Sequence, residues 1–547
     1  MTRHWVGCAM PWWQWCAMGG ECGVGGVSEE FPLPASWALA KLDEVAQLAP
    51  EVSLDGIDAA APVHFVPMAA VAEDFSGVDV SALRPLSEVR KGYTGFVSGD
   101  VLLAKITPCM ENGKGGLVPP LPHRVAFGST EFHVLRSSVA VSNSWVAWFL
   151  SQPLFRKNAK ANMSGTAGQM RVPTKWLRAV DLPVPPRAEQ TRIVAKLEEL
   201  LSDLDAGVAE LKAAQKKLAQ YRQSLLKAAV TGELTAKWRA ARALSESGEA
   251  ENGQQFLQRI LTERRAGWEA KQLAKFKAQG KTPPKDWQKK YPEPVQPDTS
   301  GLPELPEGWV WASVDQLSES VRNGLSKTPN TTQCGFPIFK INAVRPMTVN
   351  FDAIKHIEID QNEAADYWVE VGDVLATRYN GSVDLLGVFG MIKDVSVRTL
   401  YPDKLIRMKP VTGVELGAWM EVCGNVGLSR KHLVSRVKTT AGQTGISGDD
   451  LKKTPIPLPP VAEQEVTLAV LKDRLQAVQE LGLPIELGLK QSTAQRQNIL
   501  RTAFAGQLVP QDLADEPASV LLARIRAERA QREAVKKPRG RKPKEAA

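Results

Sequence analysis

The segment Pro185-Pro186-Arg187-Ala188-Glu189-Gln190 returns almost unchanged as Pro459-Pro460-Val461-Ala462-Glu463-Gln464. At both places, short β-branched and aromatic runs separated by Gly, Pro and Asn give way to a long helical pattern. Short runs of that kind predict strands in a mixed α/β module. Proline just before or inside the first turn is compatible with the start of a helix. The sequence therefore predicts two modules, each followed by a long helix.

Other anchors recur at nearly the same offset as these two joints. The joints are 274 residues apart, Leu-Pro-x-x-Trp returns after 272 residues, Gly-Asp-Val-Leu after 273 and Thr-Ala-Gly-Gln after 274. Their first copies begin at Leu33, Gly99 and Thr166, and their second copies at Leu305, Gly372 and Thr440. A fixed offset held over several anchors indicates an internal repeat.

The two copies diverge between the anchors. Lys105-Ile106-Thr107-Pro108 stands where the second copy has Arg378-Tyr379-Asn380-Gly381. A shared frame with different intervening residues indicates two modules that perform one task on different targets.

The helix after the first joint carries a heptad pattern, which is typical of a coiled-coil seam. Its seam positions are Leu197, Leu204, Leu211, Leu218 and Leu225, with companions at Leu200, Ala214, Tyr221 and Ala228. The second helix keeps the register less regularly, at Leu471, Val478, Ile485 and Ile499, and Ser492 interrupts it. Two such seams most simply pack antiparallel against each other; the alternative is two unrelated amphipathic helices, each lying on its own module.

A proline lies within the second helical pattern. Pro484 follows Gly482, and proline inside a helix costs roughly 3 kcal/mol and usually kinks or breaks it. We therefore expect a bend or break near residues 482–484.

Composition limits the possible function classes without choosing among them. The chain has 547 residues, a formal net charge of +8 and a pI of about 9.0, which fits a polyanionic partner and equally a basic surface. Its six cysteines include no Cys-x-x-Cys pair, so a zinc site or a disulfide framework is not expected, and a reducing cytoplasm fits best. No stretch is long and apolar enough to suggest a membrane span.

These motifs resemble the conserved regions of the specificity subunits of type I restriction–modification systems. The resemblance covers about residues 31–530. It is carried by the two joints, by Gly-Asp-Val-Leu-Leu-Ala-Lys-Ile-Thr-Pro-Cys at 99–109, by Gly-Ser-Thr-Glu-Phe-His at 128–133, by Lys285-Asp286-Trp287 and by Leu-Pro-Glu-Leu-Pro at 302–306. The N-terminal extension and Pro484 depart from the family pattern.

The resemblance implies a mixed α+β fold with a pseudo-twofold internal repeat, in which two long antiparallel coiled-coil helices separate two globular target-recognition domains. The expected boundaries are a disordered extension (1–30), target-recognition domain 1 (31–185), the first helix (186–235), a helical segment and linker (236–300), target-recognition domain 2 (301–459), the second helix (460–509), and a C-terminal helix with a basic tail (510–547). Within the linker, 271–300 is rich in Lys and Pro.

The resemblance also implies the partners. Each target-recognition domain would read one half of a bipartite, asymmetric site in double-stranded DNA. Two methyltransferase (M) subunits would dock on the helices, and restriction (R) subunits would join them. The chain would hold no cofactor itself, because the S-adenosylmethionine, ATP and Mg²⁺ of such a complex belong to these partners.

Base reading calls for bidentate side chains, Arg or Lys for guanine and Asn or Gln for adenine. Arg and Lys also suit phosphate contacts, although a residue of that kind is more often plain surface. The candidates for base contact are Lys105, Asn112, Lys114, Arg378 and Asn380, and the candidates for phosphate contact are Arg90, Lys91, Arg430 and Lys431. Gln169 and Gln443, in Thr-Ala-Gly-Gln, are further candidates, and a structural turn is the favoured interpretation for both.

No catalytic motif is evident. The chain lacks a Walker GxxxxGK[ST] sequence, and the double prolines at 119–120 and 459–460 have apolar neighbours, unlike the Asn-Pro-Pro-Tyr motif of amino-methyltransferases. The sequence thus predicts a non-catalytic subunit. The alternatives are a specificity subunit of a related, type IIB-like system and a coiled-coil scaffold that binds proteins and not DNA.

Overall fold

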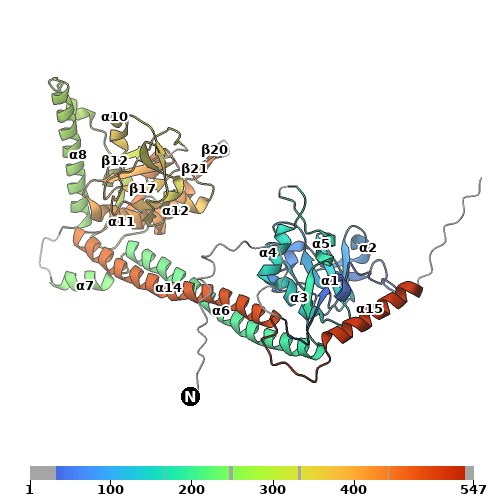
Figure 1. Ribbon diagram of the computed structural model, residues 1–547. Helices are drawn as coiled ribbons and strands as arrows, with labels where there is room; N and C mark the ends of the chain where they lie inside the picture. Colours follow the sequence, from blue (N-terminus) through green and yellow to red (C-terminus); the bar gives the residue numbers. More distant parts are fainter. Residues whose placement is uncertain (1–32, 167, 246–250, 331–333, 441–442, 536–547) are drawn as a thin grey trace, which may run out of the picture. The chain divides into compact units, whose positions relative to one another are not determined.

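The computed structural model describes residues 33–166, 168–245, 251–330, 334–440 and 443–535 (Figure 1). The chain divides into two compact units: unit 1 is drawn from Met1–Leu211 and Leu487–Ala547, and unit 2 is Lys212–Glu486. Each unit contains one module and part of each long helix. The predicted N-terminal extension (1–30) and the basic tail from residue 536 onward lie outside the described residues.

The module of unit 1 is built on two four-stranded sheets. One has the order β2-β9-β6-β7 and is antiparallel throughout; the other has the order β4-β3-β8-β5, in which only β3 and β8 are parallel. Its strands are β1 (Ala38–Lys41), β2 (Ala46–Leu48), β3 (Pro62–Val66), β4 (Leu83–Pro85), β5 (Thr94–Val97), β6 (Val101–Ala104), β7 (Gly115–Leu117), β8 (Val125–Gly128), β9 (Phe132–Ser137) and β10 (Asp181–Val184).

Short helices cover these sheets. Ser142 caps α3, accepting a hydrogen bond from the Trp145 N–H at 3.1 Å, and Trp145 is fully buried. The helices are α1 (Leu42–Val45), α2 (Leu86–Val89), α3 (Asn143–Ser151), α4 (Pro153–Ala161) and α5 (Thr174–Arg178), with 3₁₀ turns η3 (Met68–Ala70) and η4 (Glu73–Phe75).

The module of unit 2 repeats the first sheet and replaces the second. Its four-stranded antiparallel sheet has the order β12-β19-β17-β18, and the remaining strands form two-stranded pairs. Its strands are β11 (Val310–Ser313), β12 (Ser318–Asn323), β13 (Phe336–Phe339), β14 (Val344–Arg345), β15 (Thr348–Val349), β16 (Ile354–Ile357), β17 (Val374–Thr377), β18 (Phe389–Met391), β19 (Leu405–Pro410), β20 (Lys438–Thr440), β21 (Gln443–Gly445) and β22 (Pro455–Leu458).

The second module, like the first, also contains short helices. They are α9 (Val314–Leu317), α10 (Gln361–Ala364), α11 (Val414–Asn425), α12 (Gly427–Ser435) and α13 (Gly448–Lys452), with 3₁₀ turns η6 (Ile341–Ala343), η7 (Ala365–Tyr367) and η8 (Val383–Leu385). In sequence order β2, β6, β7 and β9 correspond to β12, β17, β18 and β19, and the order within the sheet is the same. The internal repeat is therefore a repeat of fold, and the modules differ in what surrounds the shared sheet.

Two helices of 44 residues each follow the joints, α6 (Arg187–Val230) and α14 (Val461–Phe504). In unit 1, Arg496 forms an ion pair with Asp205 (2.6 Å), while a Cβ added at Gly488 would lie 3.1 Å from Cδ1 of Leu211. Later positions of α6 thus meet earlier positions of α14, so the pair is antiparallel. The predicted mixed fold with two long packed helices is confirmed.

The predicted seam residues are not equally buried. Leu197, Leu225 and Leu471 are buried, whereas the others are half-buried: Leu204, Leu211, Leu218, Val478, Ile485 and Ile499. Tyr221, expected beside the seam, is 46% exposed, and next to Leu197 the buried companion is Leu201, whereas the expected Leu200 is half-buried. A straight helix drifts against a strict seven-residue repeat, which explains the change of companion positions.

Of the bend or break expected near residues 482–484, the break does not occur: α14 is continuous through Pro484. Proline leaves the carbonyl of the residue four positions earlier, Glu480, without its helical donor. Both residues are exposed, so water can satisfy that carbonyl.

Buried carboxylates tie each joint to its module. In unit 1, Glu189 accepts a hydrogen bond from the Trp37 indole N–H (3.0 Å), and in unit 2 Glu463 accepts one from Trp309 (2.8 Å). Burial raises the pKa of Glu189. The Trp of Leu-Pro-x-x-Trp and the Glu of the joint are thus partners, which explains why the two motifs recur together.

The end of each long helix packs against one of the two Leu-Pro-x-x-Trp loops, which we term the tryptophan loops. Gly506, beyond α14, has a φ of +70°, and an added Cβ would lie 2.4 Å from Pro34. Gly232, beyond α6, has a φ of +73°, and an added Cβ would lie 2.7 Å from Pro306. Only glycine fits both the left-handed conformation and the close approach. Consequently α14 ends against the first module, in unit 1, and α6 ends against the second, in unit 2.

Three further helices complete the units: α7 (Ala236–Ser245), α8 (Gly253–Ala278) and α15 (Ala518–Val535). Phe256, Leu257 and Ile260 of α8 join the core of the second module, while Ala518, Leu522 and Ile525 of α15 join that of the first. The segment predicted to be a linker from Lys271 is helical up to Ala278. At the 3₁₀ turn η5 (Trp287–Lys290) it packs back on α8, where Trp287 stacks on Trp268 with ring centroids 5.8 Å apart.

Candidate nucleic-acid interface

In the first module, Lys105 lies at the end of β6, between two loops. Its N–H donates to the Glu131 carbonyl (2.9 Å), and its carbonyl accepts from the Val172 N–H (2.8 Å). Ile106 forms an isolated bridge with Arg171. The strand end thus joins the loop containing Glu131 to the loop that contains Gln169, whose side chain is exposed.

An ion pair fixes this arrangement. The guanidinium of Arg171 donates to both carboxylate oxygens of Glu131, with contacts of 2.8 to 3.1 Å, and also to the Gln169 carbonyl at 3.1 Å. Hydrogen bonding to Arg171 lowers the pKa of Glu131, and Lys105 adds to the effect. The carboxylate therefore holds the Gln169 loop beside Lys105.

The second module joins the corresponding segments. The carbonyl of Arg378, at the end of β17, accepts a hydrogen bond from the Ile446 N–H (2.9 Å). Tyr379 forms an isolated bridge with Gly445, and the Asn380 N–H donates to the Thr444 carbonyl (3.4 Å). Of the Thr-Ala-Gly-Gln motif of this module, the structure describes Thr440, the last residue of β20, and Gln443, the first residue of β21. Arg378, Asn380 and the Gln443 strand are thus brought together, as Lys105 and Gln169 are in the first module.

The chemistry that holds the loop differs between the modules. An added Cβ at Gly445 would lie 2.5 Å from the Tyr379 ring, so this ring lies directly on the hairpin. The Arg378 guanidinium carbon and Lys404 Nζ lie 4.8 and 4.9 Å from the centroid of that ring. These are cation–π distances. By the repeat offset, Tyr379, Lys404 and Gly445 stand in the places of Ile106, Glu131 and Arg171. An aromatic contact flanked by cations replaces an ion pair.

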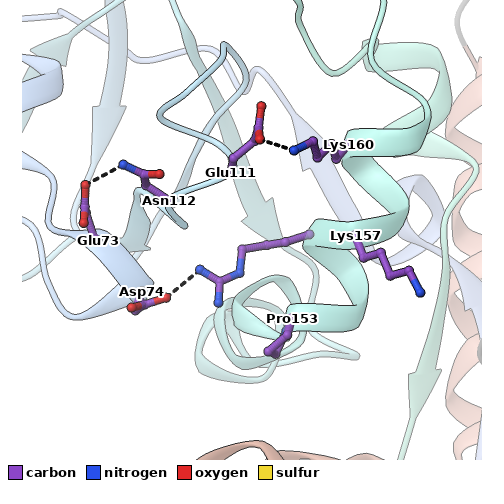
Figure 2. A pocket seen from close by; sticks show the side chains of 8 residues that line it. Glu73, Asp74, Glu111, Asn112, Pro153, Lys157 and Lys160 are labelled. Atoms are coloured by element: carbon purple, nitrogen blue, oxygen red, sulfur yellow. Dashed lines mark hydrogen bonds and ion pairs between the residues drawn. The ribbon is translucent and has the colours of Figure 1, made fainter. Parts of the chain in front are cut away.

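Two other candidates of the first module lie in a different setting. Asn112 donates to Glu73 (2.8 Å), and Lys114 donates to the Met68 carbonyl (3.2 Å). Asn112 lines a pocket of mixed charge between two loops and α4 (Figure 2). Its amide is engaged within the protein, and its role in DNA contact stays a prediction.

The acidic and basic side chains of that pocket pair with one another. Figure 2 shows an arginine of α4 reaching Asp74, and Lys160 reaching Glu111. These contacts are the ion pairs Arg156–Asp74 and Lys160–Glu111, both 2.5 Å. Lys157, also of α4, is exposed and has no ion-pair partner among the described residues. Because its acids and bases neutralise one another, the pocket is poorly suited to bind an anion.

The predicted phosphate contacts also differ from one another. Arg90 and Lys91 are exposed at the end of α2, and Lys431 is exposed on α12. The guanidinium of Arg430 instead donates to the carbonyls of Leu386 and Asp384, and burial lowers its pKa. The contacts of Arg430 are sufficient to explain it as a structural residue.

Sequence reasoning did not single out Glu131, Arg171, Tyr379 or Lys404. A signal was present, because Glu131 lies in the motif at 128–133 and the fixed offset maps it onto Lys404. Across the described residues, no group of three or more His, Cys, Asp or Glu side chains could hold a metal ion. None of the helices in this part of the chain is both long and apolar enough to cross a membrane.

The duplicated module and the packed pair of long helices together form a fold that is known from a solved structure. A structure solved in a study of complex assembly and conformational transition of the type I restriction–modification system shares this fold, with a TM-score of 0.55 and 19% identity over 87% of this chain and 100% of that one.

Sequence comparison makes the relationship specific. The chain is 27% identical to the specificity subunit of the type I restriction enzyme EcoEI from Escherichia coli, over 82% of this chain and 80% of that protein. It is 29% identical to the EcoKI specificity subunit from strain K12, over 75% and 76% of the two chains. No family model matches. The chain is a relative of type I specificity subunits.

Proposed function

We propose that this chain is the non-catalytic, DNA-reading specificity subunit of a type I restriction–modification complex. Each module would contact one half of a bipartite site in duplex DNA. One observation carries the proposal: a strand end and a Thr-Ala-Gly-Gln loop meet in the same way in both modules, around different side chains. The relationship to specificity subunits supports it.

The side chains at these two places suit base reading. Lys105 and Arg378 can donate to guanine, whereas Gln169, Asn380 and Gln443 offer the amide that pairs with adenine. Because Asn380 stands in the place of Thr107, and because the side chains that hold the two loops also differ, the two half-sites would differ in sequence. The complete site would then be asymmetric.

The helices would hold the modules at a fixed spacing and bind partners. A helix of 44 residues is about 66 Å long, which is comparable to two turns of B-DNA at roughly 34–36 Å each. In α14, Leu481, Leu483 and Leu487 are 56–61% exposed. Within unit 2 a groove runs between α11 and α14, lined by Leu471, Leu475 and Val478 among others. These apolar surfaces suit docked methyltransferase subunits.

The remaining partners follow from the same proposal. Restriction subunits would join the methyltransferase subunits, and S-adenosylmethionine, ATP and Mg²⁺ would bind to these partners and not to this chain. The complex would act in the cytoplasm.

Methylation mapping tests the proposal. The full chain is co-expressed with its modification subunits in a host that lacks the system, and methylated bases are mapped across the genome, with the subunits expressed without the chain as control. A split, asymmetric motif that appears only with the chain is expected. Methylation that does not depend on the chain, or a continuous motif, would contradict the proposal, as would methylation or cleavage by the purified chain alone.

A further inference from the structure

The most concentrated positive charge of the described chain lies outside both base-reading loops. Residues 271–290, which we term the lysine segment, contain seven lysines and one acidic residue, a net charge of +6 in a chain whose total is +8. The segment comprises the last turns of α8, the connection after it and η5. Some charge at a helix C-terminus is explained by the helix dipole, but only within the last turn.

Most of these lysines have no internal partner. Lys271 pairs with Glu319 and Lys289 with Asp286. The other five are exposed, and among the residues that the structure describes none of them has an ion-pair partner: Lys275, Lys277, Lys281, Lys285 and Lys290. The nearby acids Glu269 and Glu293 face Arg265 instead. The positive field of the segment is therefore not neutralised locally.

The segment is also ordered by aromatic packing. Trp287 stacks on Trp268 (5.8 Å, 22° between the rings) and meets Phe276 at 6.1 Å, while Tyr291 packs on Trp268 at 5.5 Å. The Tyr291 hydroxyl accepts from Arg264 (2.6 Å). A flexible linker needs no such core. Side chains held on a fixed scaffold lose less conformational entropy when they bind a ligand.

The lysine segment is separate from the base-reading loop of its own unit. In Figure 1 the free end of α8 and the β20–β21 hairpin lie on opposite sides of the second module. A duplex bound to the lysine segment would therefore be contacted at a place away from the bases that the hairpin reads. Contacts of lysine with phosphate carry no sequence information.

We propose that the lysine segment binds the phosphate backbone of duplex DNA without sequence preference, at a place distinct from the half-sites. It adds affinity that is independent of the bases read. The choice of DNA over another polyanion rests on the proposed function. An acidic surface on a partner protein is the alternative occupant.

The test is the salt dependence of binding to a labelled duplex of random sequence, measured by fluorescence anisotropy with the full chain. K275Q/K277Q/K281Q removes three unpaired lysines of the segment. K212Q/K216Q/K217Q removes three exposed lysines of α6 in the same unit and is the matched control. Because each phosphate contact contributes about 0.9 to the slope of log K against log salt, the first variant should flatten the slope by about 2 to 3, and the control by less than half of that.

Lysine-to-arginine replacement at the same three positions should retain the slope, and equal thermal melting would show that the variants fold. An unchanged slope in K275Q/K277Q/K281Q overturns the proposal. If this variant keeps the slope but loses association with a partner subunit, the segment binds protein and not DNA, and the proposal is overturned as well. An equal loss in the control overturns it too, because net charge alone would then explain the effect. Random DNA needs no half-site reading, so this result is independent of the methylation map that tests the proposed function.

Discussion

At the scale of single residues, the repeated motifs have partners that explain them. In Gly-Asp-Val-Leu, Asp100 pairs bidentately with Arg136, both contacts 2.8 Å, and accepts from the Val97 N–H. Its counterpart Asp373 accepts from the Glu370 N–H at 2.8 Å, but its nearest guanidinium nitrogen, on Arg407, is 3.7 Å away. The same motif is thus well paired in one module and poorly paired in the other.

This difference predicts a pH effect on the second module. Burial raises the pKa of Asp373 to about 6, above an unfolded value near 3.8. The protonated form is favoured in the folded state, so the contribution of Asp373 to stability is full below pH 4 and is lost as the pH rises through 6, by about 3 kcal/mol. Asp373→Asn should therefore raise the melting temperature at pH 7 and have less effect at pH 4.5. Equal shifts at both pH values, measured by calorimetry, would count against this account.

The ion pair beside Gln169 predicts a loss confined to one half-site. Glu131→Gln keeps the shape of the side chain but weakens its hold on Arg171, so binding through the first half-site should fall about two- to fivefold, as for other exposed pairs. The measurement compares duplexes in which either half of the mapped site is scrambled.

Two further variants make this test specific. The charge swap E131R/R171E should recover part of the loss, and Lys404→Gln, at the corresponding position of the second module, should affect only the other half-site. Equal losses at both half-sites would show that Glu131 supports the whole fold and not one loop.

At the scale of elements, the long helices are linked to the modules at both ends. Each begins at a joint where a buried glutamate bonds a tryptophan, and each ends at a glycine that packs on a tryptophan loop. Between these ends, α14 continues through Pro484, and Gly488 allows close approach to Leu211. Local sequence rules predicted a bend or a break, and the helix remains unbroken because the freed carbonyl is exposed to solvent.

The helix pair predicts how spacer length is set. Inserting seven residues after Leu211 in α6 and seven before Leu487 in α14 should lengthen the pair by about 10 Å, at 1.5 Å per residue. The unread spacer between half-sites should then grow by about three base pairs, which methylation mapping would reveal. Insertion in α6 alone breaks the pairing and should abolish methylation. A normal spacer in the double insertion would remove the role of the helices in spacing.

At the scale of the whole molecule, each unit combines distant parts of the sequence. Unit 1 completes the first module with the end of α14 and with α15, and unit 2 completes the second with the end of α6 and with α8. The rings of Phe504 and Trp145 pack with their centroids 4.3 Å apart, although the two residues are 359 positions apart in sequence. Neither module has its complete core without a helix that begins at the other joint.

Module exchange tests whether reading is modular despite this sharing. Replacing residues 31–185 with the corresponding module of a relative, while keeping Trp37, should change one half of the methylated motif and leave the other half and the spacer intact. The reverse exchange of 301–459, keeping Trp309, should change the other half. If either exchange alters both halves in methylation maps, recognition is a property of the assembled chain and not of each module.

The sequence alone determined the duplication, the two joints and the two long helices. A fixed repeat offset and a seven-residue period can both be read from the order of residues along the chain, without knowledge of their contacts. The sequence also indicated Lys105 and Arg378 as corresponding strand ends. The tertiary structure decided which segments meet: Glu131 with Arg171, Tyr379 with Gly445, and the lysine segment with its aromatic support. These contacts join residues that lie between 11 and 66 positions apart in sequence. They depend on side-chain packing and close backbone approach, for which no short sequence pattern is sufficient.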